Sequence, residues 1–252
     1  MTSRAQILAE MGLGPIWRLR SSDTDSHSVE PVAAIDVISE PSDAPLAKAP
    51  MGDARADLIA RMDWQALKAA VAECRACGLC ASRKNTVFGI GDEKARWLIV
   101  GEAPGQDEDL RGEPFVGQAG RLLDNMLAAI DLKRGEDVYI ANVLKCRPPG
   151  NRNPEPEEIA QCSPHLQRQI ELIQPKLIVA MGRFAAQTLL QSGASIASLR
   201  GRRHAYQGVP LIVTYHPAYL LRSMLDKARA WEDLCYARSL MRELSAQDAA
   251  TA

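Results

Sequence analysis

Four short apolar runs, each followed directly by polar, glycine or proline residues, constrain the fold of this 252-residue chain more than any other feature. A continuous apolar run of this length is typical of a strand that is buried on both faces, as in a parallel sheet covered by helices. Segments with helical spacing separate the runs, and this alternation predicts three layers, α/β/α, around a mostly parallel sheet of four strands. The predicted strands are residues 97–100, 138–143, 177–181 and 211–214, and the predicted helices are residues 119–130, 154–173, 183–191 and 225–244.

The chain divides by composition into three predicted parts. Residues 1–20 contain many apolar side chains and are interpreted as a short partner-binding peptide. Residues 21–53 are rich in Ser, Asp, Ala and Pro, and because such a composition cannot bury enough surface to offset chain entropy, we predict a flexible linker. Residues 54–245 are long enough to form a sizeable core and are the predicted globular domain. The alternative for residues 1–20 is a helix that packs back onto this domain.

Charge and hydropathy exclude some classes of function. Residues 1–50 hold 4 Lys and Arg against 7 Asp and Glu, and residues 51–252 hold 26 against 24. The predicted domain is therefore mildly basic, which permits DNA binding without indicating it. No apolar run approaches the length of a membrane span, and the N-terminus lacks the apolar core of a signal peptide. We therefore expect a cytoplasmic enzyme that does not bind a membrane, and we take a monomer as the default state.

Five of the six cysteines are spaced as ligands of a metal centre. Cys74 and Cys77 form a Cys-x-x-Cys pair, Cys80 repeats this spacing, and Cys146 and Cys162 follow far along the chain. Thiolates from one tight turn and two distant segments suit zinc or an iron–sulfur cluster. Spacing alone leaves five candidates for four ligand positions. The sixth cysteine lies within the last predicted helix and is interpreted as an ordinary buried side chain.

Polar side chains lie at the carboxyl ends of predicted strands, where parallel sheets place their ligand sites. Glu102 and the acidic residues 107–109 follow the first strand, Asn142 lies in the second, and His216 follows the last. An unpaired buried amide costs about 1–3 kcal/mol, so Asn142 either bonds to neighbouring backbone or is held for a ligand. The acidic loop is alternatively a solvated turn, and His216 is alternatively structural. Phe115, in a Gly/Pro loop, either anchors the core or stacks on a ligand.

Several motifs in a consistent order give residues 67–244 a specific resemblance to a known family. The motifs are CRAC, VFGIGD, WLIVGEAPGQDED, GEPFVGQAGRLLD, VYIANVLKCRPPGNRNP, LIVAMG and HPAYLLR. This stretch resembles the family 4 uracil-DNA glycosylases, an iron–sulfur class of DNA repair enzymes. The resemblance implies the uracil-DNA glycosylase fold and an enzyme that hydrolyses the N-glycosidic bond of uracil in single- or double-stranded DNA, which begins base excision repair.

The same resemblance assigns the metal ligands. It implies a [4Fe–4S] cluster held by Cys74, Cys77, Cys146 and Cys162, and it leaves Cys80 outside the ligand set. The cluster is then most simply structural, because its ligands bracket loops and none of them belongs to the predicted pocket.

The resemblance also implies roles for the residues at the strand ends. Phe115 stacks on uracil, Asn142 reads the edge of the base, and His216 donates to uracil O2, where negative charge develops. Glu102 stabilises the sugar cation or orients the attacking water. Glu108 is the second candidate for that task, or it excludes the methyl group of thymine.

Three further positions complete the predicted site. Ala103 stands where related glycosylase families carry an aspartate, which leaves the identity of the water-activating group open. Leu220, at the tip of the last loop, fills the space that a flipped base vacates, and Arg222 holds a flanking phosphate. No basic, histidine-containing insertion follows the first motif, so we expect turnover rather than covalent trapping on DNA.

The first twenty residues resemble the N-terminal peptide of the psi subunit of the bacterial clamp loader, through MTSR followed by LGPIWRLR. In that family the peptide docks on the chi subunit, so the resemblance implies chi as a partner.

Two other functions remain open. An electron-transfer protein would account for the cysteines but leave Asn142 and His216 without a role. An adaptor held to the clamp loader, with weak or lost catalysis, would need only residues 1–20.

Overall fold

The computed structural model describes residues 54–251, which all belong to one compact unit. The predicted partner-binding peptide and linker, residues 1–53, lie outside the described residues. Among residues 54–251, no helix combines the length and the apolar character that a membrane span requires.

A six-stranded sheet forms the middle layer of the domain, in the order β1-β3-β2-β4-β6-β5. The four central strands run parallel and correspond to the four predicted strands. The edge strands β1 and β5 are antiparallel to their neighbours and were not predicted, because neither contains an apolar run. The strands are β1 Ile90–Gly91, β2 Trp97–Gly101, β3 Val138–Asn142, β4 Leu177–Met181, β5 His204–Tyr206 and β6 Val209–Thr214.

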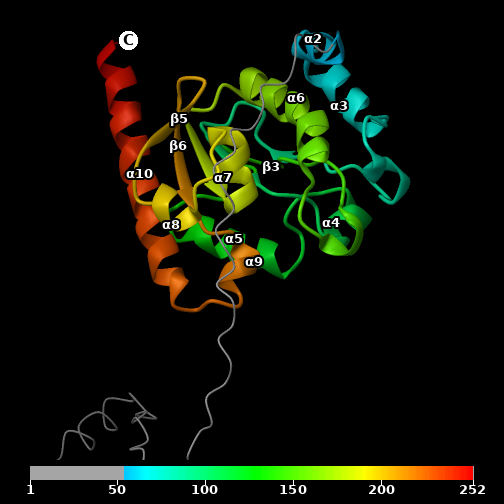
Figure 1. Cartoon of the computed structure of the whole chain (residues 1–252). Coiled ribbons are helices and arrows are strands. Elements are labelled where there is room, and N and C mark those ends of the chain that lie inside the picture. Colours follow the sequence, from blue (N-terminus) through cyan, green and yellow to red (C-terminus); the bar gives the residue numbers. More distant parts are fainter. Residues whose placement is uncertain (1–53, 252) are drawn as a thin grey trace, which may run out of the picture. The chain divides into compact units, whose positions relative to one another are not determined.

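Helices cover both faces of this sheet (Figure 1). The long helices occur where they were predicted, although α6 begins two residues later than expected and α10 continues to Thr251, past the predicted ends of the helix at 244 and of the domain at 245. The short helices α4, α8 and α9 were not predicted, because four to six residues are too few to show a helical period. The described helices are α2 Ala54–Ala60, α3 Trp64–Ala72, α4 Gln106–Arg111, α5 Gln118–Ala128, α6 Pro156–Ile173, α7 Arg183–Leu190, α8 Ile196–Leu199, α9 Pro217–Leu220 and α10 Asp226–Thr251.

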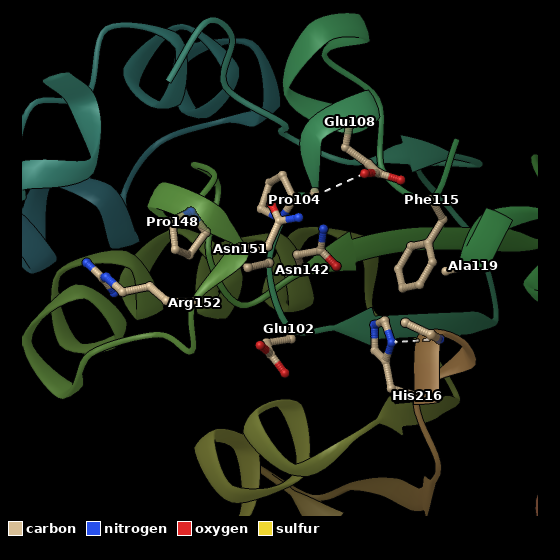
Figure 2. A pocket seen from close by; sticks show the side chains of 13 residues that line it. Glu102, Pro104, Glu108, Phe115, Ala119, Asn142, Pro148, Asn151, Arg152 and His216 are labelled. Carbon is tan, nitrogen blue, oxygen red and sulfur yellow. Dashed lines mark hydrogen bonds between the residues drawn. The ribbon is translucent and has the colours of Figure 1, made fainter. Parts of the chain in front are cut away.

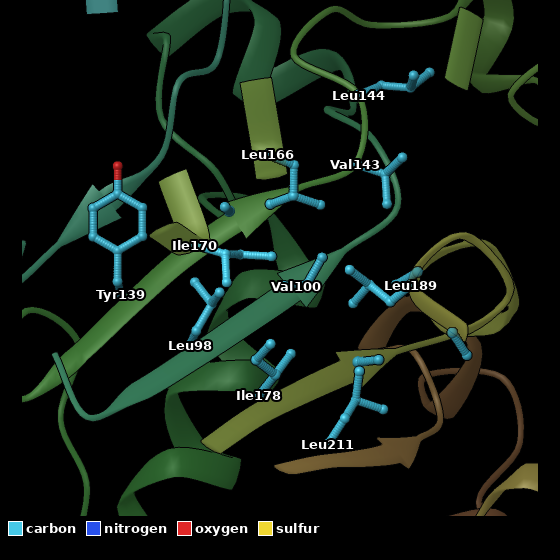
Figure 3. Close-up of a cluster of buried hydrophobic side chains, with 14 of the residues drawn as sticks. Leu98, Val100, Tyr139, Val143, Leu144, Leu166, Ile170, Ile178, Leu189 and Leu211 are labelled. Carbon is cyan, nitrogen blue, oxygen red and sulfur yellow. The ribbon is translucent and has the colours of Figure 1, made fainter. Parts of the chain in front are cut away.

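Alternate residues of the central strands face opposite helical layers, as strand geometry requires. Leu98 and Val100 of β2 pack in one core cluster with side chains of α6 and α7, which Figure 3 shows. Trp97 and Ile99 pack in a second cluster with side chains of α5 and α10. All four side chains are at most 3% exposed. The predicted three-layer α/β/α fold is therefore confirmed.

The order in which strands are added to the sheet reverses at β2, which lies between β3 and β4. After β2 the chain forms β3 on one side of it, and it then crosses over to form β4 on the other side. The loops after β2 and β3 therefore diverge at the carboxyl edge of the sheet, and a crevice opens at such a point. The register places Gly101, the last residue of β2, directly beside Asn142, the last residue of β3.

The acidic segment after β2 forms the short helix α4 rather than a loop. The last of its carboxylates, that of Asp109, is neither exposed to solvent nor part of the pocket lining. Asp109 is 3% exposed, and its Oδ1 accepts hydrogen bonds from the backbone N–H groups of Lys84 (2.8 Å) and Asn85 (3.3 Å). Asp109 therefore fastens α4 to the segment that precedes β1.

Candidate active site

A pocket of about 200 Å³ opens at the carboxyl edge of the sheet, where β2 and β3 end. Figure 2 shows the side chains of Asn142, Phe115 and His216 around one opening, with Glu102 on the side away from Glu108. Six of the eight predicted catalytic and substrate-binding residues line this pocket, and Leu220 and Arg222 do not. The six are Glu102, Ala103, Glu108, Phe115, Asn142 and His216.

Asn142 holds an unused hydrogen-bond acceptor in this pocket. Its side chain is 2% exposed, and within the described part of the chain its Oδ1 has no hydrogen-bond partner. Its own carbonyl accepts a hydrogen bond from the buried ammonium of Lys145 at 2.9 Å, which fixes the backbone at this position. An orphaned buried acceptor is costly, and this one belongs to a residue that lines the pocket, where a ligand or a water that brings a donor can satisfy it.

Phe115 is held in an unusual backbone conformation beside Asn142. Its φ angle is +55°, a conformation that costs an aromatic residue about 1–3 kcal/mol and persists only where the surroundings impose it. The ring is stacked against the imidazole of His216, with centroids 5.4 Å apart. Gly120 permits this arrangement, because a Cβ atom there would lie 1.7 Å from the Phe115 carbonyl oxygen.

Glu108 links the start of α4 to the loop that carries Phe115. Its Oε2 accepts a hydrogen bond from the Gly105 N–H at 3.1 Å. Its Oε1 accepts hydrogen bonds from the N–H groups of Val116 at 3.0 Å and Gly117 at 3.2 Å. The Glu108 carboxylate is therefore fixed in the pocket wall by three backbone donors.

His216 presents a defined hydrogen-bond donor to the pocket. It caps the N-terminus of α9, and its Nδ1 accepts a hydrogen bond from the Ala218 N–H at 3.2 Å. Because Nδ1 is the acceptor, the proton of a neutral ring must be on Nε2. Burial lowers the pKa of His216 from 6.5 to about 4, so the ring is neutral at pH 7.

Glu102 is the carboxylate that follows β2 directly. Burial raises the pKa of its carboxyl above the usual value, and the positive charge of Arg183 offsets part of this rise. No hydrogen bond to its carboxylate is found within residues 54–251, in contrast to Glu108. Its carboxylate therefore remains available to a ligand or to water.

The loop after β6 differs from the prediction. Leu220 is 1% exposed and belongs to the core cluster of α5 and α10, so its predicted position at the tip of the loop is wrong. The reason is the helical turn of α9, which directs Leu220 inward and leaves Leu221 42% exposed. Arg222 is exposed and forms no ion pair with any residue that the structure describes.

The loop between β3 and α6 contributes pocket residues that the sequence did not single out. Pro148, Asn151 and Arg152 line the pocket opposite Phe115. Arg152 is paired with Glu158 in α6, with 2.6 Å between Nη2 and Oε1. The sequence feature that could have identified these three residues is the Gly/Pro-rich composition of this loop, which follows the carboxyl end of a strand.

The five spaced cysteines all line a second, separate cavity. Arg83 Nη1 donates to Cys146 Sγ at 3.1 Å, and the Lys145 backbone N–H donates to Cys162 Sγ at 3.2 Å. Among residues 54–251, no three His, Cys, Asp or Glu side chains converge closely enough to hold a single metal ion.

Comparison with known proteins agrees with this geometry. Residues 88–235 match the uracil DNA glycosylase superfamily. A type-4 uracil-DNA glycosylase of Archaeoglobus fulgidus is 50% identical over 159 residues, which are 60% of this chain and 79% of the relative. One of Pyrobaculum aerophilum is 42% identical over 183 residues, which are 69% of this chain and 92% of the relative. A type-5 enzyme of the same organism is 33% identical over 146 residues, 52% of this chain and 64% of the relative.

The chain belongs to the type-4 uracil-DNA glycosylases. The region of this type-4 glycosylase that matches the superfamily contains every pocket residue named above, together with Cys146 and Cys162. Cys74 and Cys77 precede that region, so the cysteine cavity joins two parts of the chain.

We predict that His216 is neutral at pH 7, with its proton on Nε2. Because burial lowers the pKa of the ring, a proton on His216 opposes folding, and the free energy of unfolding falls as the pH decreases from about 6.5 toward about 4. Long-range ¹H–¹⁵N NMR of the imidazole, assigned with a His216→Gln variant, measures both the tautomer and the pKa. A protonated Nδ1, or a pKa of 6.5 or higher, would contradict this account.

Proposed function

We propose that the pocket binds a uracil base that has been flipped out of DNA, and that the enzyme hydrolyses the bond between this base and its sugar. The observation that carries the proposal is the unpaired Asn142 Oδ1, which lies beside the Phe115 ring in a pocket that also contains the His216 imidazole. Membership of the type-4 family supplies the reaction class. An extrahelical base is required, because the target bond is not accessible inside a stacked duplex.

The amide of Asn142 accounts for the choice of uracil over cytosine. Its Oδ1 accepts a hydrogen bond from uracil N3–H, and its NH₂ group donates one to uracil O4. Cytosine presents an acceptor at N3 and a donor at the exocyclic amine, so both contacts would become repulsive. Stacking on the Phe115 ring fixes the plane of the base and contributes roughly 1–3 kcal/mol to the free energy of binding.

Bond cleavage leaves negative charge on uracil and positive charge on the sugar. The Nε2–H of the neutral His216 ring donates a hydrogen bond to uracil O2, where the negative charge develops. Glu102 stabilises the sugar cation or orients the water whose oxygen bonds to C1′. The electron pair of the broken C1′–N1 bond leaves with uracil, which gains a proton, and an abasic sugar remains in the DNA.

Glu102 and Glu108 are assigned different roles by their hydrogen bonds. Among the residues that the structure describes, no backbone group donates to the carboxylate of Glu102, whereas three donate to that of Glu108. We therefore assign the water or the sugar cation to Glu102, and we assign Glu108 to the wall that excludes the methyl group of thymine. Ala103 provides no carboxylate for the water-activating task.

On the DNA side, we propose that Leu221, rather than the buried Leu220, is the side chain inserted into the base stack. A side chain that is 42% exposed in the loop after α9 can enter the space that the flipped base vacates. The exposed Arg222 next to it is suited to a flanking phosphate. Both single- and double-stranded DNA are compatible with these contacts.

We propose that Cys74, Cys77, Cys146 and Cys162 hold a [4Fe–4S] cluster. All four thiols line one cavity, together with the cationic side chains of Arg83 and Lys145, and this donor set suits an anionic thiolate cluster. The cluster would tie the segment before β1 to the loop after β3 and to α6. No reaction step requires it.

We also propose that residues 1–20 bind the clamp-loader chi subunit and so tether the enzyme to the replisome. The support is the resemblance to the psi peptide alone. The monomeric state and the cytoplasmic location remain predictions.

The test of the proposed activity is excision from a labelled oligonucleotide that contains one uracil, followed by alkaline cleavage. We expect product from the wild type and a rate that is lower by roughly 100-fold or more in Asn142→Ala and in His216→Ala. Asn125→Ala, an exposed asparagine of α5, is the matched control and should excise at the wild-type rate. Absence of product from a cluster-loaded wild type would refute the activity and favour the electron-transfer or adaptor role.

The same assay separates catalysis from tethering. A variant without residues 1–53 should excise normally and should no longer bind the isolated chi subunit. Binding that survives the deletion would refute the tether.

The ligand assignment predicts different outcomes for two cysteines of the same cavity. Cys162→Ser should lose the visible absorbance of the cluster and the bound iron, whereas Cys80→Ser should retain both. Absorbance spectra and iron content per chain provide the measurement. Loss of the cluster in Cys80→Ser to the same extent would contradict the assignment.

A further inference from the structure

The loop that carries Phe115 is held from two sides by charged side chains. On one side, Arg134 donates from Nη1 to the Pro114 carbonyl at 2.9 Å and from Nη2 to the Phe115 carbonyl at 2.8 Å. On the other side, Glu108 accepts from the N–H groups of the next two residues, Val116 and Gly117. We call Arg134 and Glu108 the peptide clamp, because together they bind backbone groups of four consecutive residues.

Arg134 is itself anchored outside the pocket. It lies in the turn after α5 that the bridge between Lys133 and Glu136 closes. Its Nε donates to Asp124 Oδ1 of α5 at 2.9 Å, and its side chain is 22% exposed. Arg134 does not line the pocket, so it would reach a bound base only indirectly, and the carbonyl of the pocket residue Phe115 accepts one of its hydrogen bonds.

The clamp accounts for a conformation that Phe115 would not adopt by itself. A φ angle of +55° is unfavourable for an aromatic residue. Contacts made by the ring alone do not fix the orientation of the adjacent peptide groups. Hydrogen bonds to the carbonyls of residues 114 and 115 fix the orientation of those peptide groups. Without the guanidinium, the loop can return to an extended conformation, which moves the ring away from His216.

We propose that Arg134 is a positioning residue for uracil recognition, which acts by holding Phe115 as the stacking face of the pocket. This inference rests on the proposed function and extends it to a residue outside the pocket. Its guanidinium is suited to the task, because a planar group with several donors can bind two carbonyls and one carboxylate at once.

The test compares Arg134→Gln with Arg238→Gln, a matched control. Arg238, in α10, forms an ion pair with Asp131 at 3.5 Å, and it does not line the pocket. We expect Arg134→Gln to lower the single-turnover excision rate roughly tenfold and to weaken inhibition by free uracil by a similar factor, since base–aromatic stacking is lost. Binding of uracil-free DNA should change by less than about twofold, because phosphate contacts dominate it. Arg238→Gln should match the wild type.

A double-mutant cycle with Phe115→Ala distinguishes positioning from general stabilisation. If Arg134 acts through the Phe115 ring, Arg134→Gln should cause little further loss when the ring is already absent. Equal losses in both backgrounds, or wild-type rate and uracil inhibition in Arg134→Gln, would overturn the proposal. Asp124→Ala, which removes only the anchor of Arg134, should give a smaller loss in the same direction and replaces Arg134→Gln if that variant does not fold. Wild-type protein without excision activity would instead refute the proposed function.

Discussion

The pocket depends on the absence of a side chain at Gly101. A Cβ atom at this position would lie 2.4 Å from Asn142 Oδ1 and 2.6 Å from Phe115 Cζ, closer than real Cβ contacts allow. The parallel register of β2 and β3 brings Asn142 to this point, and Phe115, whose φ angle is positive, brings its ring there from the loop between α4 and α5. Because Gly101 has no side chain, the amide of Asn142 and the ring of Phe115 lie close together. A planar base can then stack on the ring while its edge bonds to the amide.

Much of this arrangement could be predicted from the sequence, because it follows from local patterns. The four apolar runs identify the parallel strands, and the polar residues at their carboxyl ends, Glu102, Asn142 and His216, meet because parallel strands end at one edge. The motifs that carry the family resemblance contain the same residues. The family assignment and the three-layer fold are therefore confirmed, while the catalytic roles and the cluster remain proposals.

The remaining features depend on tertiary contacts that no local pattern encodes. The edge strands β1 and β5 are too short to show a period. The inward direction of Leu220 follows from a single helical turn in α9, which reverses the exposure of two neighbouring leucines. Arg134 reaches the Phe115 loop from a turn nearly twenty residues later in the chain. Hydrogen bonds from a side chain to distant carbonyls leave no trace in hydropathy or spacing.

The most direct test of the central claim is excision by Gly101→Ala under single-turnover conditions, together with its melting temperature. Alanine suits the strand backbone at this position, and the atoms nearest to the added methyl group belong to the side chains of Asn142 and Phe115. We predict that excision falls by roughly 100-fold or more while the melting temperature changes by no more than about 5 °C. Excision near the wild-type rate would contradict the account, because the amide and the ring would then not need to approach each other across Gly101.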